Sequence, residues 1–93
     1  MPSAGREAWE ALRAAHRWDV PARYNLAWDV CEKWARVEPD RLALIYLRPD
    51  GQRRDYSYIQ LSRAAKRFAN ALEGHGIGQG DRLGILLPQM PET

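Results

Sequence analysis

The last third of the chain constrains its fold most, because it has the pattern of a strand, a capped helix and a second strand. Arg53–Tyr56 is predicted to be a strand, a helix is predicted from Tyr58 to about Glu73, and the apolar run Leu83–Leu87 has the length of a buried strand. Strand, helix and strand within about 35 residues form a βαβ unit with a right-handed crossover. The predicted fold class is therefore α/β: the N-terminal portion of a multilayer α/β subdomain with two helices, a β-hairpin and then a βαβ unit, whose sheet is incomplete.

Local signals mark both ends of the predicted helix. Ser57 and Gln60 have the spacing of a capping box, in which each side chain bonds the other residue's free backbone N–H. Either Gly74 or Gly76 is expected to end the helix in the left-handed conformation, with Ile77 making the accompanying apolar contact. The buried face is expected to contain Leu61, Ala65, Phe68 and Leu72. The solvent face is expected to contain Arg63, Lys66, Arg67 and Asn70.

Two further helices are predicted near the N-terminus. The first is expected over Glu7–Arg17. The second begins at the N-cap Asn25 and stops near Val37, because the residue before Pro39 avoids the helical conformation. Its apolar stripe consists of Ala27, Val30, Cys31, Trp34 and Ala35.

A β-hairpin is predicted between these helices and the last third of the chain. Leu42–Leu47 is a continuous apolar run of strand length, and Arg53–Tyr56 returns as its partner. Pro49-Asp50-Gly51 makes the turn, because proline presets φ and glycine accepts a positive φ.

Composition limits the classes of protein to which the chain can belong. Ninety-three residues suffice for one small domain of marginal stability, and the single Cys31 excludes an intrachain disulfide. The net charge of +2 comes from interspersed acidic and basic residues, which argues against a nucleic-acid arm or a polybasic membrane patch. No apolar run could span a bilayer or serve as the core of a signal peptide, and Glu7, Glu10 and Asp19 are atypical of a transit peptide. A cytoplasmic location is therefore expected.

The features that could carry chemistry each have a simpler structural explanation. The run Gly74–Gly80 follows a helix and precedes a strand, whereas phosphate-binding glycines follow a strand and open a helix. His75 lies at a helix C-terminus, where a capping role is favoured. His16 and Cys31 lie far from it in sequence, which gives no zinc-ligand spacing. Cys31 lies on an apolar helix stripe without a partner base, as is typical of an inert thiol.

The aromatic residues raise one alternative, a surface on which single-stranded nucleic acid could stack. The chain has four tryptophans, Trp9, Trp18, Trp28 and Trp34. Four arginines, Arg6, Arg13, Arg17 and Arg23, are interleaved with the first of these tryptophans. The net charge is too low and too evenly spread to favour nucleic-acid binding, and Trp34 has the spacing of a core residue. From the residues alone, no catalytic, cofactor-binding or metal-binding residue is assigned.

Several short segments together resemble a known signature. They are Asp55–Leu61, Ala64–Ala65, Phe68–Leu72, Gly76–Ile77, Gly80–Leu83 and Leu86–Glu92. They resemble the N-terminal signature of the AMP-forming adenylating enzymes, which include acyl-CoA synthetases, luciferases and peptide-synthetase adenylation domains. Upstream, Val20–Ala27 and Asp29–Ala35 resemble the acetyl- and medium-chain acyl-CoA synthetase branch. The resemblance extends from about Asp19 to Glu92. Ser57 and Gln60 stand where the family more often has Thr and Glu, and both pairs can form a capping box.

The resemblance implies a two-step ligase that activates a carboxylic acid with ATP and Mg²⁺ to an acyl-adenylate and transfers the acyl group to coenzyme A. The family's nucleotide-binding loop and adenylation lysine lie downstream of this region, so no catalytic residue is carried over. The residues carried over are structural: Ser57, Gln60, Gly76, Gly80, Asp81 and Pro88–Pro91. Residues 1–23 are expected to be a helical extension, and residues 24–93 the truncated start of the N-terminal AMP-binding domain.

Two interpretations follow. In the first, the chain is an inactive scaffold fragment of such a ligase, whose partners are the acid, ATP and coenzyme A. In the second, it is a stand-alone interaction module that self-associates, or pairs with a separate remainder, through the open sheet edge of Leu83–Leu87. Neither includes nucleic acid or a membrane span, and both predict self-association of the isolated chain.

Overall fold

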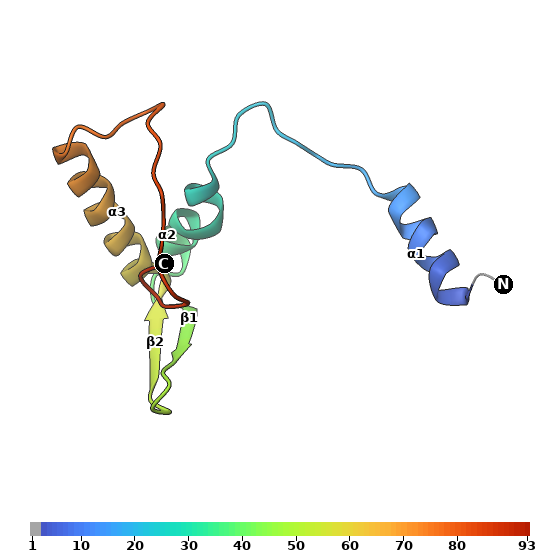
Figure 1. Cartoon of the computed structure of the whole chain (residues 1–93), viewed down its shortest axis with the longest axis horizontal. Coiled ribbons are helices and arrows are strands. Elements are labelled where there is room, and N and C mark those ends of the chain that lie inside the picture. Colours follow the sequence, from blue (N-terminus) through green and yellow to red (C-terminus); the bar gives the residue numbers. More distant parts are fainter. Residues whose placement is uncertain (1–2) are drawn as a thin grey trace.

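The computed structural model describes residues 3–93. Its elements, in order, are helix α1 (Ala4–Ala15), the π-helical turn η1 (Trp28–Glu32), helix α2 (Lys33–Val37), strands β1 (Leu42–Leu47) and β2 (Arg53–Ser57), and helix α3 (Tyr58–Gly74). The two strands form one antiparallel sheet (Figure 1). The predicted α/β class with an incomplete sheet is confirmed.

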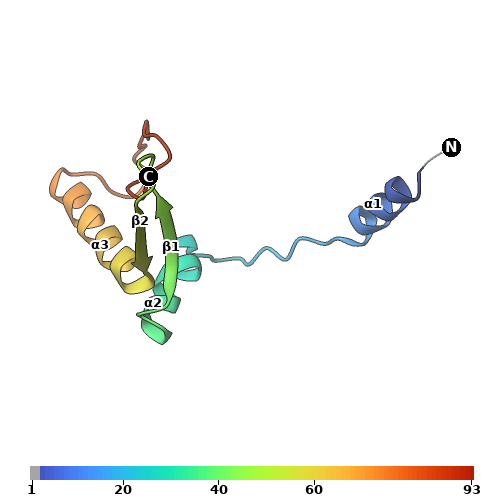
Figure 2. The same ribbon diagram turned by 90° about the horizontal axis from the view of Figure 1, so that it is seen from below.

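The molecule is open. Figures 1 and 2 show a body made of η1, α2, the hairpin and α3, with α1 standing apart at the end of an extended segment. The Cα radius of gyration is 19.2 Å, whereas a compact domain of this length would have about 12 Å. Much apolar surface therefore stays uncovered.

The hairpin forms where the sequence predicts it. Leu44 pairs with Tyr56 and Tyr46 with Arg54. At the turn, the Arg48 N–H donates to the Gln52 carbonyl at 2.9 Å. Gly51 has φ = 84°, the positive value that glycine adopts without strain.

Both predicted ends of α3 are confirmed. The Gln60 N–H donates to Ser57 Oγ at 3.4 Å, and the Ser57 N–H donates to Gln60 Oε1 at 2.8 Å, which completes the capping box. At the other end Gly76, not Gly74, has the positive φ, 79°. The Ile77 N–H donates to the Leu72 carbonyl at 3.0 Å, as in a Schellman cap.

The N-terminal helices also begin at capping residues. Asn25 Oδ1 accepts from the Trp28 N–H at 3.1 Å, which confirms the predicted N-cap. Helix α1 begins earlier than predicted, because Ser3 Oγ accepts from the Arg6 N–H at 3.3 Å and fixes its first turn. It ends before His16, whose backbone is extended.

The contact between η1–α2 and α3 is partly polar. Among residues 3–93 the buried ones are Ala35 and Ser62, with 4% and 3% of their surface exposed. Ser62 Oγ donates to Glu32 Oε2 at 2.5 Å. Glu32 Oε1 also accepts from Lys66 Nζ at 2.9 Å and from Arg36 Nε at 3.3 Å. Lys66 is exposed, as expected of the solvent face, and its ammonium group also reaches Glu32 on the neighbouring helical segment.

These three donors hold the Glu32 carboxylate ionised. The hydrogen bond from Ser62, then that from Lys66, lowers the pKa of Glu32 to about 2, from an ordinary value of 4.5. The Glu32 side chain is only 19% exposed. An ionised carboxylate that is largely shielded from water needs these partners, because an unpaired buried charge would lower the stability of the fold.

Two expectations for the last third of the chain are corrected. Leu83–Leu87 is not a strand, so the βαβ unit is not formed, because no described strand lies beside this run to complete its hydrogen bonds. Its side chains are exposed, Leu86 almost completely at 98%. Phe68 and Ala65, expected on the buried face of α3, are also exposed, because nothing in residues 3–93 packs over them.

Replacing Ser57 with alanine should loosen the start of α3. The change removes the acceptor of the Gln60 N–H and should cost about 1 kcal/mol. We expect faster amide exchange in the first turn of α3 and less helix by far-UV circular dichroism. Ser57→Asp keeps an acceptor there and is the matched control. Unchanged exchange in the alanine variant would contradict this role of the capping box.

Acid should loosen the packing of α3 on η1–α2. The folded pKa of Glu32 lies below its ordinary value, so the stabilisation is complete above about pH 4.5 and is lost as the pH falls toward 2. NMR titration of the Glu32 carboxyl group, together with amide exchange in α3, measures both effects. Glu32→Gln should abolish this acid dependence, whereas Glu10→Gln, in an exposed pair with Arg6, should leave it unchanged. An ordinary carboxyl midpoint at Glu32 would refute the prediction.

Candidate functional site

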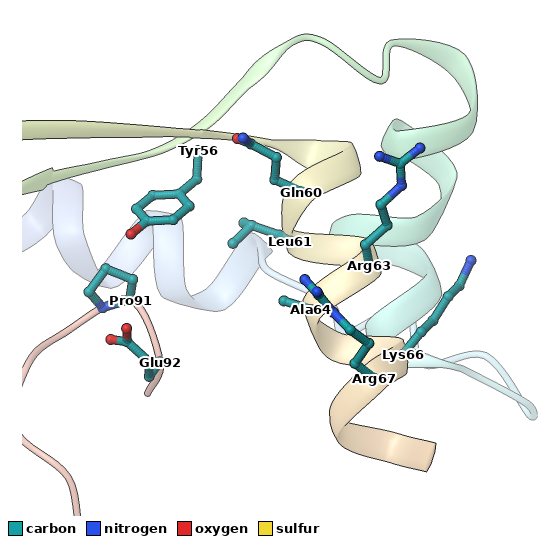
Figure 3. Close-up of a pocket in the computed structure, with 9 residues that line it drawn as sticks. All are labelled: Tyr56, Gln60, Leu61, Arg63, Ala64, Lys66, Arg67, Pro91 and Glu92. Atoms are coloured by element: carbon teal, nitrogen blue, oxygen red, sulfur yellow. The ribbon is translucent and has the colours of Figure 1, made fainter. Parts of the chain in front are cut away.

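A groove of about 680 Å³ lies between α3 and the C-terminal segment (Figure 3). Nine residues line it: Tyr56, Gln60, Leu61, Arg63, Ala64, Lys66, Arg67, Pro91 and Glu92. The capping box fixes the direction of α3 directly after β2 and so positions one wall. The opposite wall is the C-terminal turn, where the Thr93 N–H donates to the Met90 carbonyl at 3.0 Å.

The groove combines an apolar floor with charges at its rim. Leu61 and Ala64 face the ring of Tyr56 and Pro91, with Glu92 on the same side as Pro91 (Figure 3). Arg63 and Lys66 extend away from the groove. Its polar groups are the phenol of Tyr56, the amide of Gln60, the cations Arg63, Lys66 and Arg67, and the carboxylate of Glu92.

The two histidines lie in separate parts of the chain. His16 follows α1 and packs edge-on against Trp18, with ring centroids 4.7 Å apart. His75 caps α3, where its backbone N–H donates to the carbonyls of Ala71 and Leu72, in agreement with the predicted capping position. No cluster of metal-ligating side chains forms within residues 3–93.

Cys31 behaves as a structural thiol. Cys31 lies in η1 and is half-buried against α3, where its Sγ donates to the Tyr58 carbonyl at 3.9 Å. Desolvation by burial, followed by the charge of Glu32, raises the pKa of the thiol. The reactive thiolate is therefore disfavoured at neutral pH.

The Gly-rich run forms turns, as its order in the sequence predicts. Gly76 and Gly80 have positive φ values of 79° and 89°. Asp81 Oδ2 accepts from the Gly78 N–H at 2.7 Å and closes the second turn. The run follows α3 and opens no helix, so its N–H groups do not form the helix-terminal anion site of a phosphate loop.

The tryptophans do not form one stacking surface. Trp34 packs near Tyr58 at 6.4 Å between centroids, and Lys33 lies 5.2 Å from its ring. Arg36 lies 5.0 Å from the ring of Trp28. These cation–π contacts are internal to the η1–α2 segment.

Sequence reasoning missed the polar contact of Glu32 with Ser62, which lines a second groove of about 370 Å³ between η1–α2 and α3. One signal was present: Ser62 and Lys66 are one turn apart and border the apolar face of the predicted helix. The partner on the other helix could not be inferred from that spacing. Within the described part of the chain, no helix combines the length and apolarity that a bilayer crossing requires.

Known proteins resemble this chain over most of its length. It is 34% identical over 89 residues to an acetyl-coenzyme A synthetase of Cryptosporidium parvum, a match that covers 95% of this chain and 13% of the relative. It is 36% identical over 88 residues to the mitochondrial acyl-coenzyme A synthetase ACSM2A of Homo sapiens, covering 88% of this chain and 15% of the relative. An acetyl-coenzyme A synthetase of Laribacter hongkongensis is 30% identical over 77 residues, covering 83% of this chain and 12% of the relative. No solved structure matches.

The chain therefore spans a small part, between 12% and 15%, of the length of these relatives. The family model described as AMP-binding enzyme matches residues 31–93, which is more than half of the chain. The matched region includes the capping box, α3 and its Schellman cap, the features that the sequence resemblance rested on. The chain belongs to the AMP-binding enzyme family.

Proposed function

We propose that this chain is the N-terminal portion of an ATP-dependent acid–thiol ligase that forms acyl-CoA through an acyl-adenylate. The family match over residues 31–93 carries the proposal, and the relatives named acetyl- and acyl-coenzyme A synthetases support it. In this proposal residues 24–93 begin the N-terminal AMP-binding domain and residues 1–23 are a helical extension. The whole ligase would take a carboxylic acid, ATP with Mg²⁺, and coenzyme A.

Within that ligase the chain would act as scaffold, with no catalytic, cofactor-binding or metal-binding residue of its own. Two observations are in keeping with this role: His16 and His75 lie in separate parts of the chain, and burial raises the pKa of the Cys31 thiol. A cytoplasmic location stays a prediction, because several relatives carry the word mitochondrial in their names.

A second candidate is a stand-alone interaction module that self-associates or pairs with a separate remainder. The exposure of Ile85 and Leu86, at 71% and 98%, favours it, because an uncovered apolar run of this kind promotes association. The run is not a strand here, so pairing through its edge would require it to become one on binding.

The purified chain should not catalyse ATP–pyrophosphate exchange. Acetate, butyrate, octanoate and benzoate are suitable acids, because they cover short, medium and aromatic carboxylates. A full-length acetyl-coenzyme A synthetase, assayed in parallel, is the positive control. Exchange above background with the 93-residue chain would refute the scaffold role.

Sedimentation velocity over a range of concentrations tests the self-association that both candidates predict for the isolated chain. An interaction module that binds itself should give a sedimentation coefficient that rises with concentration. The double change Ile85→Ser and Leu86→Ser should abolish the rise, whereas Leu12→Ser in α1 is the matched control. A chain that remains a monomer at all concentrations would contradict the interaction module, and it would also count against the incomplete core expected of a scaffold fragment.

A further inference from the structure

Helix α1 and the segment after it form a largely apolar patch that no other part of residues 3–93 covers. Trp9 and Leu12 lie one turn apart on α1 and keep 64% and 70% of their surface exposed. Trp18, which is 84% exposed, packs edge-on against His16 with ring centroids 4.7 Å apart. These four side chains, together with Arg13, line one hollow of about 650 Å³. We call Trp9, Leu12, His16 and Trp18 the α1 patch.

The charges of α1 are divided between two sides of the helix. Arg6 and Arg13 lie one turn before and one turn after Trp9, so both border the α1 patch. Glu7 and Glu10 lie toward the opposite side of the helix, where Glu10 pairs with Arg6 at 3.3 Å. A surface that contacts the α1 patch therefore meets the arginines at its border, while the two acids are turned away.

A third cation follows the helix. The guanidinium group of Arg17 donates to the carbonyls of Ala14 and His16, each at 2.9 Å, which holds its charge at the C-terminal end of α1. Among residues 3–93, no carboxylate forms an ion pair with Arg13 or Arg17. Both charges are therefore available to an anionic partner.

A lipid bilayer with anionic headgroups matches both features of the α1 patch. Tryptophan and leucine side chains bury in the boundary between headgroups and acyl chains, and bordering arginines extend to the lipid phosphates. Single-stranded nucleic acid matches less well, because bases stack on aromatic rings but offer no apolar layer for Leu12. An antiparallel second copy of α1 would bring Arg6 and Arg13 against the same arginines, and like charges repel.

The length and isolation of α1 suit a position in the plane of the surface. Its 12 residues are about 18 Å long, whereas the hydrocarbon core of a bilayer is about 30 Å thick, so α1 cannot cross it. No residue of α1 is buried, and the helix stands apart from the body in both views (Figures 1 and 2). Residues 16–23 can span roughly 26–29 Å when extended. The body can therefore remain in water while α1 lies on the surface.

We propose that α1 and Trp18 form an in-plane anchor for an anionic lipid bilayer, with the α1 patch in the interface and Arg6, Arg13 and Arg17 at the lipid phosphates. The net charge of the whole chain, +2, does not reveal this arrangement, because it sums the charges on both sides of α1. The proposal rests on residues 3–23 and does not depend on the ligase function.

Co-sedimentation of the 93-residue chain with vesicles tests the apolar part of the anchor. Vesicles of phosphatidylcholine and phosphatidylglycerol in a three-to-one ratio should bind the chain. The double change Trp9→Ser and Leu12→Ser should lower the partition coefficient by about tenfold, because two large apolar side chains no longer enter the interface. Leu86→Ser is the matched control, because it removes an equally accessible leucine outside α1 and should leave binding unchanged. Failure of the parent chain to bind, or equal binding by all three chains, would overturn the proposal.

A second pair of variants tests the charges. Arg13→Gln combined with Arg17→Gln should weaken binding to the anionic vesicles severalfold and reduce its dependence on salt. Pure phosphatidylcholine vesicles should bind the parent chain more weakly and show little difference between parent and variant. Arg63→Gln, on α3, is the control and should bind like the parent. If Arg63→Gln loses as much binding as the arginine pair on α1, the attraction is a property of net charge and the anchor is refuted.

Amide hydrogen exchange locates the contact and verifies that each variant keeps α3. Addition of the anionic vesicles should slow exchange in α1 and leave exchange in α3 unchanged, since α1 alone lies in the interface. Slowing confined to α3 or to residues 83–87 would place the contact elsewhere and overturn the proposal. So would binding of single-stranded oligothymidine at physiological salt by a chain that does not bind the vesicles.

Discussion

The carboxylate of Glu32 joins the helical elements of the body. It accepts from Ser62 and Lys66 of α3 and from Arg36 of α2, so one side chain links three donors on two elements. The buried residues described here are few and small, so little apolar burial is available to hold α3 in place. A buried polar contact can hold α3 in place only while each of its polar groups has a hydrogen-bond partner. The hydrogen bonds from Ser62 and Lys66 meet this condition for Glu32, and they are also what lowers its pKa.

The π-helical turn accounts for the position of Glu32. In η1 the Lys33 N–H donates to the Trp28 carbonyl, five residues back, in place of the usual four. The wider turn changes which side chains share a face. Val30, predicted on the buried stripe, is 54% exposed, whereas the side chains of Cys31 and Glu32 both contact α3. Sequence periodicity assumes a regular α-helix, so it could not predict that Val30 would be exposed and that Glu32 would contact α3.

Features that depend on neighbours in sequence were predictable, and those that depend on distant partners were not. The capping box of Ser57, the Asn25 cap and the Gly51 turn each involve atoms a few residues apart, so their spacing determines them. A strand at Leu83–Leu87 and a buried Phe68 require a partner surface, and residues 3–93 do not supply one. The same distinction explains why the candidate groove, with one wall from α3 and the other from the C-terminal turn, was not foreseen.

The exposed run Leu83–Leu87 also contains features that limit uncontrolled pairing. Apolar β-forming runs without charge tend to aggregate when uncovered. Here Arg82 precedes the run, Pro88 follows it, and Gly84 lies within it. A flanking charge and a flanking proline oppose strand addition, and an internal glycine lowers the preference for extended pairing. The run therefore has the apolar side chains to join a sheet when a suitable neighbour is present, together with neighbouring residues that disfavour pairing with an unsuitable one.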